Sequence, residues 1–163
     1  MFYHFGYSHI SYDKSYISGL TMGLGGRLAF CLTPSVRLGG MGFNSGFTYE
    51  SNSNGLGSYV NLKAGGITAE YLFTLSKHLR MSFGFLAGGG NLYHLDIISD
   101  NGSNKLVTYE KYSTFIVSPL SLFEFLFGKS YSIVLISNWI FGNKIIFGYS
   151  YGPCLHIGIL FNK

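Results

Sequence analysis

The segment from Ser8 to Asp13, SHISYD, contains the three kinds of side chain that many hydrolases combine. In such a set a histidine removes the proton of a serine hydroxyl while an acid orients the imidazole. His9 and Ser11 are two residues apart and therefore share one face of a strand, whereas Asp13 falls in the turn that follows. Nothing in the sequence clearly completes an oxyanion hole for them. We therefore expect His9 and Ser11 to form ordinary hydrogen bonds near a strand end, with a hydrolytic role as the alternative.

Six charged residues lie within segments that alternate between apolar and small or polar side chains: Arg27, Arg37, Lys63, Glu70, Arg80 and Glu124. Each occupies a position opposite the apolar residues of its own segment. A buried charge needs a partner of opposite sign, because an isolated one pays its desolvation cost without compensation. The alternation therefore predicts one enclosed, structural cluster in which Glu70 and Glu124 pair with some of the four cations.

No other pattern predicts a metal, a cofactor or a nucleic acid as a ligand. The five histidines are scattered, whereas metal ligands must cluster. The glycine runs 39–40 and 88–90 lack the Lys-Ser/Thr and the following helix of a phosphate loop. The net charge of +4 comes from 11 dispersed basic residues, without the basic stripe of a nucleic-acid-binding protein.

The segment 65–90 indicates which element carries these charges. Apolar residues occupy alternate positions in 67–75 and again in 79–87, on either side of the polar turn 76–78. Period-2 alternation around a short turn predicts an antiparallel hairpin with one apolar face.

Composition indicates the side on which that apolar face lies. Only 11% of the residues are charged, against about a quarter in soluble domains. A soluble barrel would need a charged outer face, and a lipid-facing Lys or Arg costs about 2–4 kcal/mol. We therefore predict a membrane barrel with its apolar face on lipid and its charges in a lumen filled by side chains. No run of 18 apolar residues is present, so a transmembrane helix is not expected.

The alternation predicts eight strands in a single domain, 1–163, and thus an all-β, eight-stranded antiparallel up-and-down transmembrane β-barrel. Short turns at 33–35, 76–78 and 128–130 alternate with longer loops near 44–58, 96–105 and 142–150. Short turns at one end and long loops at the other are typical of outer-membrane barrels. Changes of phase at 39–40 and 65–66 predict bulges, and Pro119 predicts a bulge or kink in its strand.

Five segments rich in glycine and aromatic residues cover most of the chain: GGRLAFCLTPSVRLGGMGF (25–43), GGITAEYLFTL (65–75), FLAGGGNLY (85–93), FIVSPLSLFEF (115–125) and GPCLHIGILF (152–161). Together they resemble a family of small, largely uncharacterised bacterial outer-membrane β-barrel proteins. The resemblance implies an eight-stranded barrel in the outer membrane of a didermal bacterium, inserted by the barrel-assembly machinery and surrounded by lipid and lipopolysaccharide. It implies no established activity and supplies no catalytic residues. The chain departs from the usual aromatic C-terminus of such barrels, because Asn162 and Lys163 follow Phe161.

The favoured hypothesis is a non-enzymatic outer-membrane barrel that supports the envelope or binds a partner through its surface loops. One alternative is an outer-leaflet lipid A-modifying hydrolase that uses His9 and Ser11. The other is a soluble, lipocalin-like carrier with an apolar cavity. The first twelve residues lack the basic and apolar regions of a signal peptide. We therefore expect that a secretion signal was removed or lies upstream of Met1.

Overall fold

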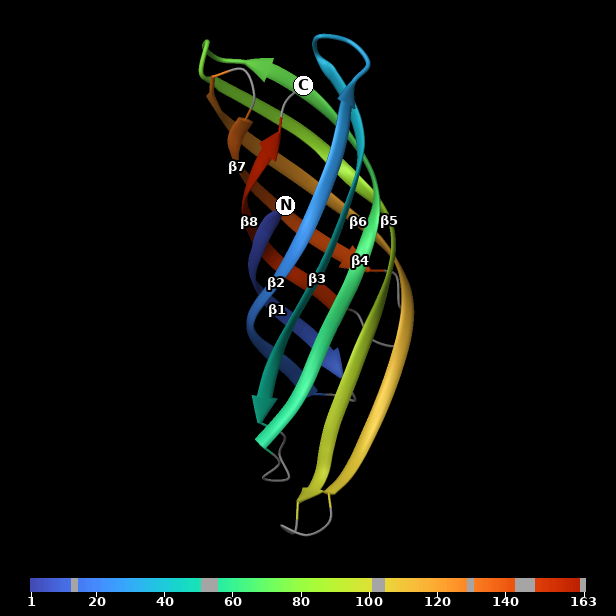
Figure 1. Cartoon of the computed structure of the whole chain (residues 1–163). Helices are drawn as coiled ribbons and strands as arrows, with labels where there is room; N and C mark the ends of the chain where they lie inside the picture. The colour runs from blue at the N-terminus through green and yellow to red at the C-terminus, as the bar shows by residue number, and fades with distance from the viewer. Residues whose placement is uncertain (13–14, 51–55, 101–104, 129–130, 143–148, 162–163) are drawn as a thin grey trace.

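The computed structural model is a closed antiparallel barrel in which consecutive strands pair and the last strand returns to the first (Figure 1). It describes residues 1–12, 15–50, 56–100, 105–128, 131–142 and 149–161. The strands are β1 (Phe2–Tyr12), β2 (Ser15–Cys31), β3 (Val36–Glu50), β4 (Leu56–Thr74), β5 (Leu79–Asp100), β6 (Lys105–Phe127), β7 (Tyr131–Gly142) and β8 (Tyr149–Phe161). The predicted all-β, eight-stranded, up-and-down architecture is therefore confirmed. Within the described ranges, no helix is long and apolar enough to cross a membrane.

Strands β3 to β6 are longer than predicted. The predicted loop 44–58 is wrong, because β3 continues to Glu50 and β4 begins at Leu56. Asn, Ser and Gly have low strand propensity, but this stretch pairs without interruption from Asn44↔Lys63 to Tyr49↔Ser58, and such pairing outweighs local propensity. Figure 1 shows the consequence: β3 to β6 project beyond the other strands at the end opposite the short turns.

Apolar side chains surround the outside of the barrel. Every strand except β3 carries at least two exposed large apolar residues, and β3 adds the half-buried Val36 and Leu38. Leu24, Phe73 and Phe83 are 49%, 44% and 47% exposed, whereas Arg27 and Glu70 are only 7% and 4% exposed. The apolar face of the sheet thus lies outside, and the charged positions lie inside.

The bulges predicted at 39–40 and 65–66 are absent. Gly39 and Gly40 pair with Ala29 and Leu28 in an unbroken register, and the β4–β5 ladder likewise passes through 65–66 without a shift. The alternation changes phase for a different reason, which is that the apolar residues move from the outer to the inner face of the sheet. Met41, Phe43 and Phe47 of β3 point inward and are buried, as do Val60 and Leu62 of β4.

The barrel therefore has two zones along its axis. Near the short turns the exterior is apolar and the lumen holds charges. Towards the projecting part of β3 to β6, apolar residues also move into the lumen, where a buried cluster includes Phe43, Leu62, Leu92 and Ile116. The exterior there is mixed, because Lys63 and Lys111 are exposed together with Val107 and Tyr109. A sheet that leaves a lipid layer and enters water would show this change of sides.

Pro119 interrupts one ladder without shifting its register. On the β5 side it pairs with Phe85. On the β7 side the pairing passes from Val117↔Phe141 directly to Leu120↔Asn138, because proline has no N–H to donate. On the other side of β7, the β7–β8 pairing shifts register next to Pro153.

Candidate functional site

Four of the predicted charged residues form one ion-pair cluster in the lumen near the short turns. Arg27 Nη2 donates to Glu70 Oε1 over 2.5 Å. Arg37 bridges both carboxylates, at 3.2 Å from Glu70 Oε2 and 2.5 Å from Glu124 Oε1. The Ser82 hydroxyl donates to Glu70 Oε2 at 2.9 Å. Two guanidinium groups and two carboxylates compensate each other, so the cluster is neutral and every carboxylate in it has a cationic partner.

Strand register brings these residues together. Arg37 and Glu70 are directly opposite each other in the β3–β4 ladder, and Arg37 reaches from β3 across the lumen to Glu124 on β6. Arg80 lies opposite Glu124 in the β5–β6 ladder but is only half-buried. No ion pair forms at Arg80 among the described residues, so it stands beside the cluster at the mouth of the lumen.

The predicted luminal position of Lys63 is wrong. Lys63 is exposed on the outside of β4, and its Nζ lies 5.3 Å from the centre of the Tyr93 ring. It does lie opposite the apolar residues of its own strand, Val60 and Leu62, but in this zone those residues fill the lumen. The sequence alternation was correct, and the side assigned to it was not.

A second polar network, unexpected from the sequence, crosses the middle of the lumen. His4 Nδ1 and His156 Nδ1 are 3.3 Å apart, His156 Nε2 is 2.9 Å from Asn138 Oδ1, and Asn138 donates to Ser118 Oγ at 3.0 Å. His4 also stacks on Phe43. His4 and His156 are directly opposite each other where β1 meets β8. A closed barrel must join its first and last strands, so counting from both termini could have indicated this pair.

A third polar group lies inside the projecting part of the barrel. The Tyr49 hydroxyl is 2.5 Å from His94 Nε2, His94 Nδ1 is 3.8 Å from Glu110 Oε2, and the Tyr112 hydroxyl donates to Glu110. Burial lowers the pKa of His94, against the opposing effect of the Asp96 and Glu110 carboxylates. The imidazole is therefore neutral near pH 7 and takes part in the Tyr49 contact as a neutral ring.

For the candidate hydrolytic residues, the structure describes the strand pairing of the backbone. His9 and Ser11 belong to β1 and pair with Ser18 and Tyr16 of β2, but their side chains, and the whole of Asp13, lie outside the described residues. Elsewhere in the described chain, no three His, Cys, Asp or Glu side chains gather as a metal site would require.

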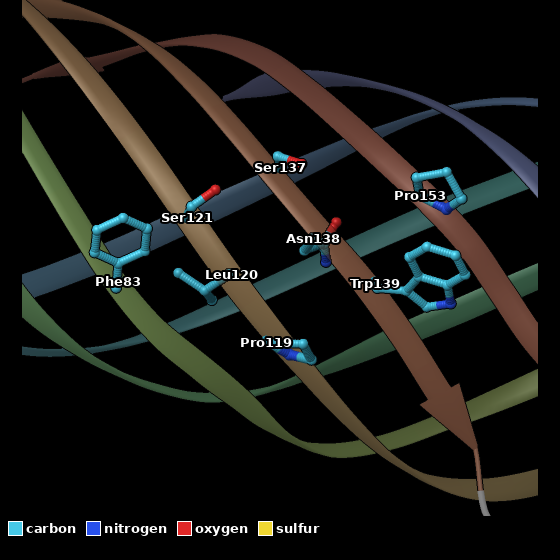
Figure 2. A pocket seen from close by; sticks show the side chains of 8 residues that line it. All are labelled: Phe83, Pro119, Leu120, Ser121, Ser137, Asn138, Trp139 and Pro153. Atoms are coloured by element: carbon cyan, nitrogen blue, oxygen red, sulfur yellow. The ribbon is translucent and has the colours of Figure 1, made fainter.

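A depression in the outer wall lies where Pro119 interrupts the β6–β7 ladder (Figure 2). Figure 2 shows Ser121 and Ser137 on neighbouring strands between Phe83 on one side and Trp139 and Pro153 on the other. The cavity has a volume of about 290 Å³, and its lining contains neither a histidine nor a carboxylate. Nothing in the lining activates the two hydroxyls as nucleophiles.

With this geometry in hand, known proteins provide a comparison. No family model matches the chain, and no curated protein matches it. Among solved structures, the chain is similar to Ail, the attachment invasion locus protein of Yersinia pestis, which was crystallised with the heparin analogue sucrose octasulfate. The TM-score is 0.57 at 11% sequence identity, over 98% of this chain and 94% of that one. The fold is that of an Ail-like barrel. At this identity the likeness extends to the fold and not to particular residues.

Proposed function

We propose that the protein is a non-enzymatic outer-membrane β-barrel with a filled lumen and a surface-binding or envelope-structural role. The observation that carries the proposal is the division of side chains between the two faces of the sheet. Exposed apolar residues surround the barrel, while Arg27, Arg37, Glu70 and Glu124 are enclosed and paired. A soluble, lipocalin-like carrier requires the opposite arrangement, with its charges in water and its apolar side chains around a cavity.

The contents of the lumen support a structural rather than a conducting interior. The ion-pair cluster and the His4–His156 network lie in the lumen together with the apolar cluster, whose Phe2 and Phe43 pack against the two histidines. Eight strands leave just enough space for side chains to fill the interior. In this proposal the lumen stabilises the barrel and transports nothing.

The projecting part of β3 to β6 supports a binding role outside the membrane. It extends past the other strands at the end opposite the short turns (Figure 1). Its exterior is mixed, with exposed Thr48 and Lys111 beside exposed Val107 and Tyr109. The similar barrel Ail was crystallised with a heparin analogue, and this chain carries the exposed lysines Lys63 and Lys111 on its exterior. The partners we propose are outer-membrane lipid and lipopolysaccharide, with the barrel-assembly machinery required for insertion.

The proposal is tested by expressing the chain behind a cleavable secretion signal in a didermal bacterium. The protein should enter the outer-membrane fraction, require detergent for extraction, and migrate differently on gels before and after boiling. A protein that remains soluble without detergent, with the same mobility in both states, would refute the membrane location. Lipid A composition in a His9→Ala strain should match that of the wild type, and an altered acyl profile would restore the hydrolase hypothesis.

A further inference from the structure

Two lysines on the outside of the barrel pack against one tyrosine ring. Lys63 Nζ lies 5.3 Å and Lys111 Nζ 5.6 Å from the ring centre of Tyr93. The three residues come from β4, β6 and β5, and Lys111 is directly opposite Tyr93 in the ladder. Both lysines are exposed, and neither forms an ion pair with a carboxylate in the part of the chain that the structure describes. The lysines approach the Tyr93 ring from the two strands that flank β5, so the cluster presents two uncompensated positive charges beside one aromatic ring.

This Lys63–Tyr93–Lys111 cluster lies at the boundary where, counted from the short turns, charged residues first appear on the outer face of β4 and β6. Strand register places four polar residues in one row across β3 to β6: Asn44, Lys63, Asn91 and Ser113. Four positions nearer the short turns, the corresponding row includes Ile67, Ala87 and Val117. In the membrane orientation proposed above, this boundary is the level of the lipid headgroups, where lysine and tyrosine are favoured.

A row of glycines separates the polar row from the apolar one. Gly26, Gly42, Gly65 and Gly89 are directly opposite one another across β2 to β5. A Cβ atom added at Gly26 would meet nothing within 4 Å, and at Gly42 and Gly89 its nearest neighbours would be 3.6 and 3.7 Å away. Packing within the chain therefore does not require glycine at these three positions. Without side chains, the row leaves bare backbone on the exterior directly beside the lysines.

We propose that Lys63 and Lys111 bind a phosphate group of an outer-leaflet saccharolipid and that one acyl chain of the same lipid lies against the glycine row. Lysine ammonium groups bind phosphate as point charges, and the amides of Asn44 and Asn91 stand in the same row to hydrogen-bond the sugar. The inference rests on the proposed outer-membrane location, and it adds a binding site for the lipid partner proposed there.

The test measures lipid binding to the full chain folded in detergent micelles, by native mass spectrometry with lipid A and with its dephosphorylated form. Wild-type protein should retain lipid A and should retain the dephosphorylated form far more weakly. Lys63→Gln and Lys111→Gln should each reduce the apparent affinity about fivefold, and the double variant about 25-fold, given the usual contribution of one basic residue near an anionic surface. Lys77→Gln removes the same charge from an exposed turn at the other end of the barrel and should change nothing.

The contribution of the glycine row is tested with Gly89→Leu, which fills the space without a backbone clash. This variant should lower lipid A retention several-fold while the lysines remain. Retention equal to wild type in Gly89→Leu would overturn the acyl-chain part of the proposal, and equal retention in the double lysine variant would overturn the phosphate part. A cluster that binds sulfated polysaccharide but not lipid A would also overturn it.

Gel mobility before and after boiling is recorded for every variant. If the wild-type protein has the same gel mobility before and after boiling, the proposed membrane function itself is refuted. A correctly folded barrel that shows no lysine-dependent binding refutes only the lipid site.

Discussion

Glu70 is the residue on which the luminal ion-pair cluster depends. It accepts hydrogen bonds from Arg27, Arg37 and Ser82 at once. Its position was predictable, because a carboxylate opposite Ile67 and Tyr71 in an otherwise apolar hairpin must be enclosed. Its partners were not predictable, since the pairing depends on which strands face each other across the lumen. The same ambiguity explains the wrong position predicted for Lys63. The alternation assigned Lys63 to one face of the sheet but did not show whether that face points into the lumen.

Replacing Glu70 by Gln should strongly destabilise the barrel. The substitution keeps the shape of the side chain but leaves Arg27 buried without its carboxylate, and loss of one partner of a buried pair costs about 3–5 kcal/mol. Urea unfolding in lipid vesicles, followed by the fluorescence of the single tryptophan, measures this change. Glu50→Gln alters an exposed carboxylate and should remain within about 0.5 kcal/mol of wild type. Equal stabilities of the two variants would contradict a stabilising role for the cluster.

His94 should make part of the stability depend on pH. Burial lowers its pKa in the folded protein, so the unfolded chain binds more protons once the pH falls below about 6.5. The contribution of His94 is therefore fully present above that pH and is lost as the pH falls towards the lowered folded pKa.

The test of this pH dependence compares wild type with His94→Gln at several pH values between 5 and 8. The groups that face His94 are Tyr49, Asp96 and Glu110, and they remain in both proteins. The difference in unfolding free energy should shrink as the pH falls. A difference that stays constant across this range would contradict the assignment of a neutral, buried imidazole.

Individual strands explain both what the sequence could predict and what it could not. The hairpin 65–90 was predictable because the same alternation, with its apolar residues on the outer face, repeats on both sides of a short turn. The segment 44–58 was not, because outside the apolar zone the pattern inverts and the Asn, Ser and Gly residues resemble a loop. The bulges predicted at 39–40 and 65–66 came from the same inversion, since a change in residue type can imitate a change in register.

Adjacent glycines of β2 should respond in opposite ways to the same substitution. A Cβ at Gly25 would collide with the Phe2 ring and lie 2.7 Å from the Gly42 carbonyl oxygen, whereas a Cβ at Gly26 points into open space. Gly25→Ala should therefore lower the unfolding free energy by about 1–3 kcal/mol through overpacking. Gly26→Ala should be neutral or should stabilise the strand by roughly 0.5–1 kcal/mol. Urea midpoints decide between them, and a larger loss in Gly26→Ala would show that the faces of β2 are assigned the wrong way round.

At the scale of the whole molecule, the central question is which part of the barrel wall faces lipid and which part faces water. In the proposed function, the closed sheet has lipid on its outside near the short turns and water on its outside in the projecting part of β3 to β6. The other conclusions depend on this division: the paired luminal charges, the apolar residues that turn inward in β3 and β4, and the role of the lysine cluster at the boundary. The central claim therefore concerns the wall of the barrel as a whole rather than any single residue.

Trp139 provides the most direct measurement of that claim. It is the only tryptophan, it lies on the exterior of β7, and it is 44% exposed. In vesicles, lipids brominated on their acyl chains should quench its fluorescence strongly, and aqueous iodide should quench it weakly. Strong quenching by iodide with no effect of the brominated lipids would place Trp139 in water and contradict the account.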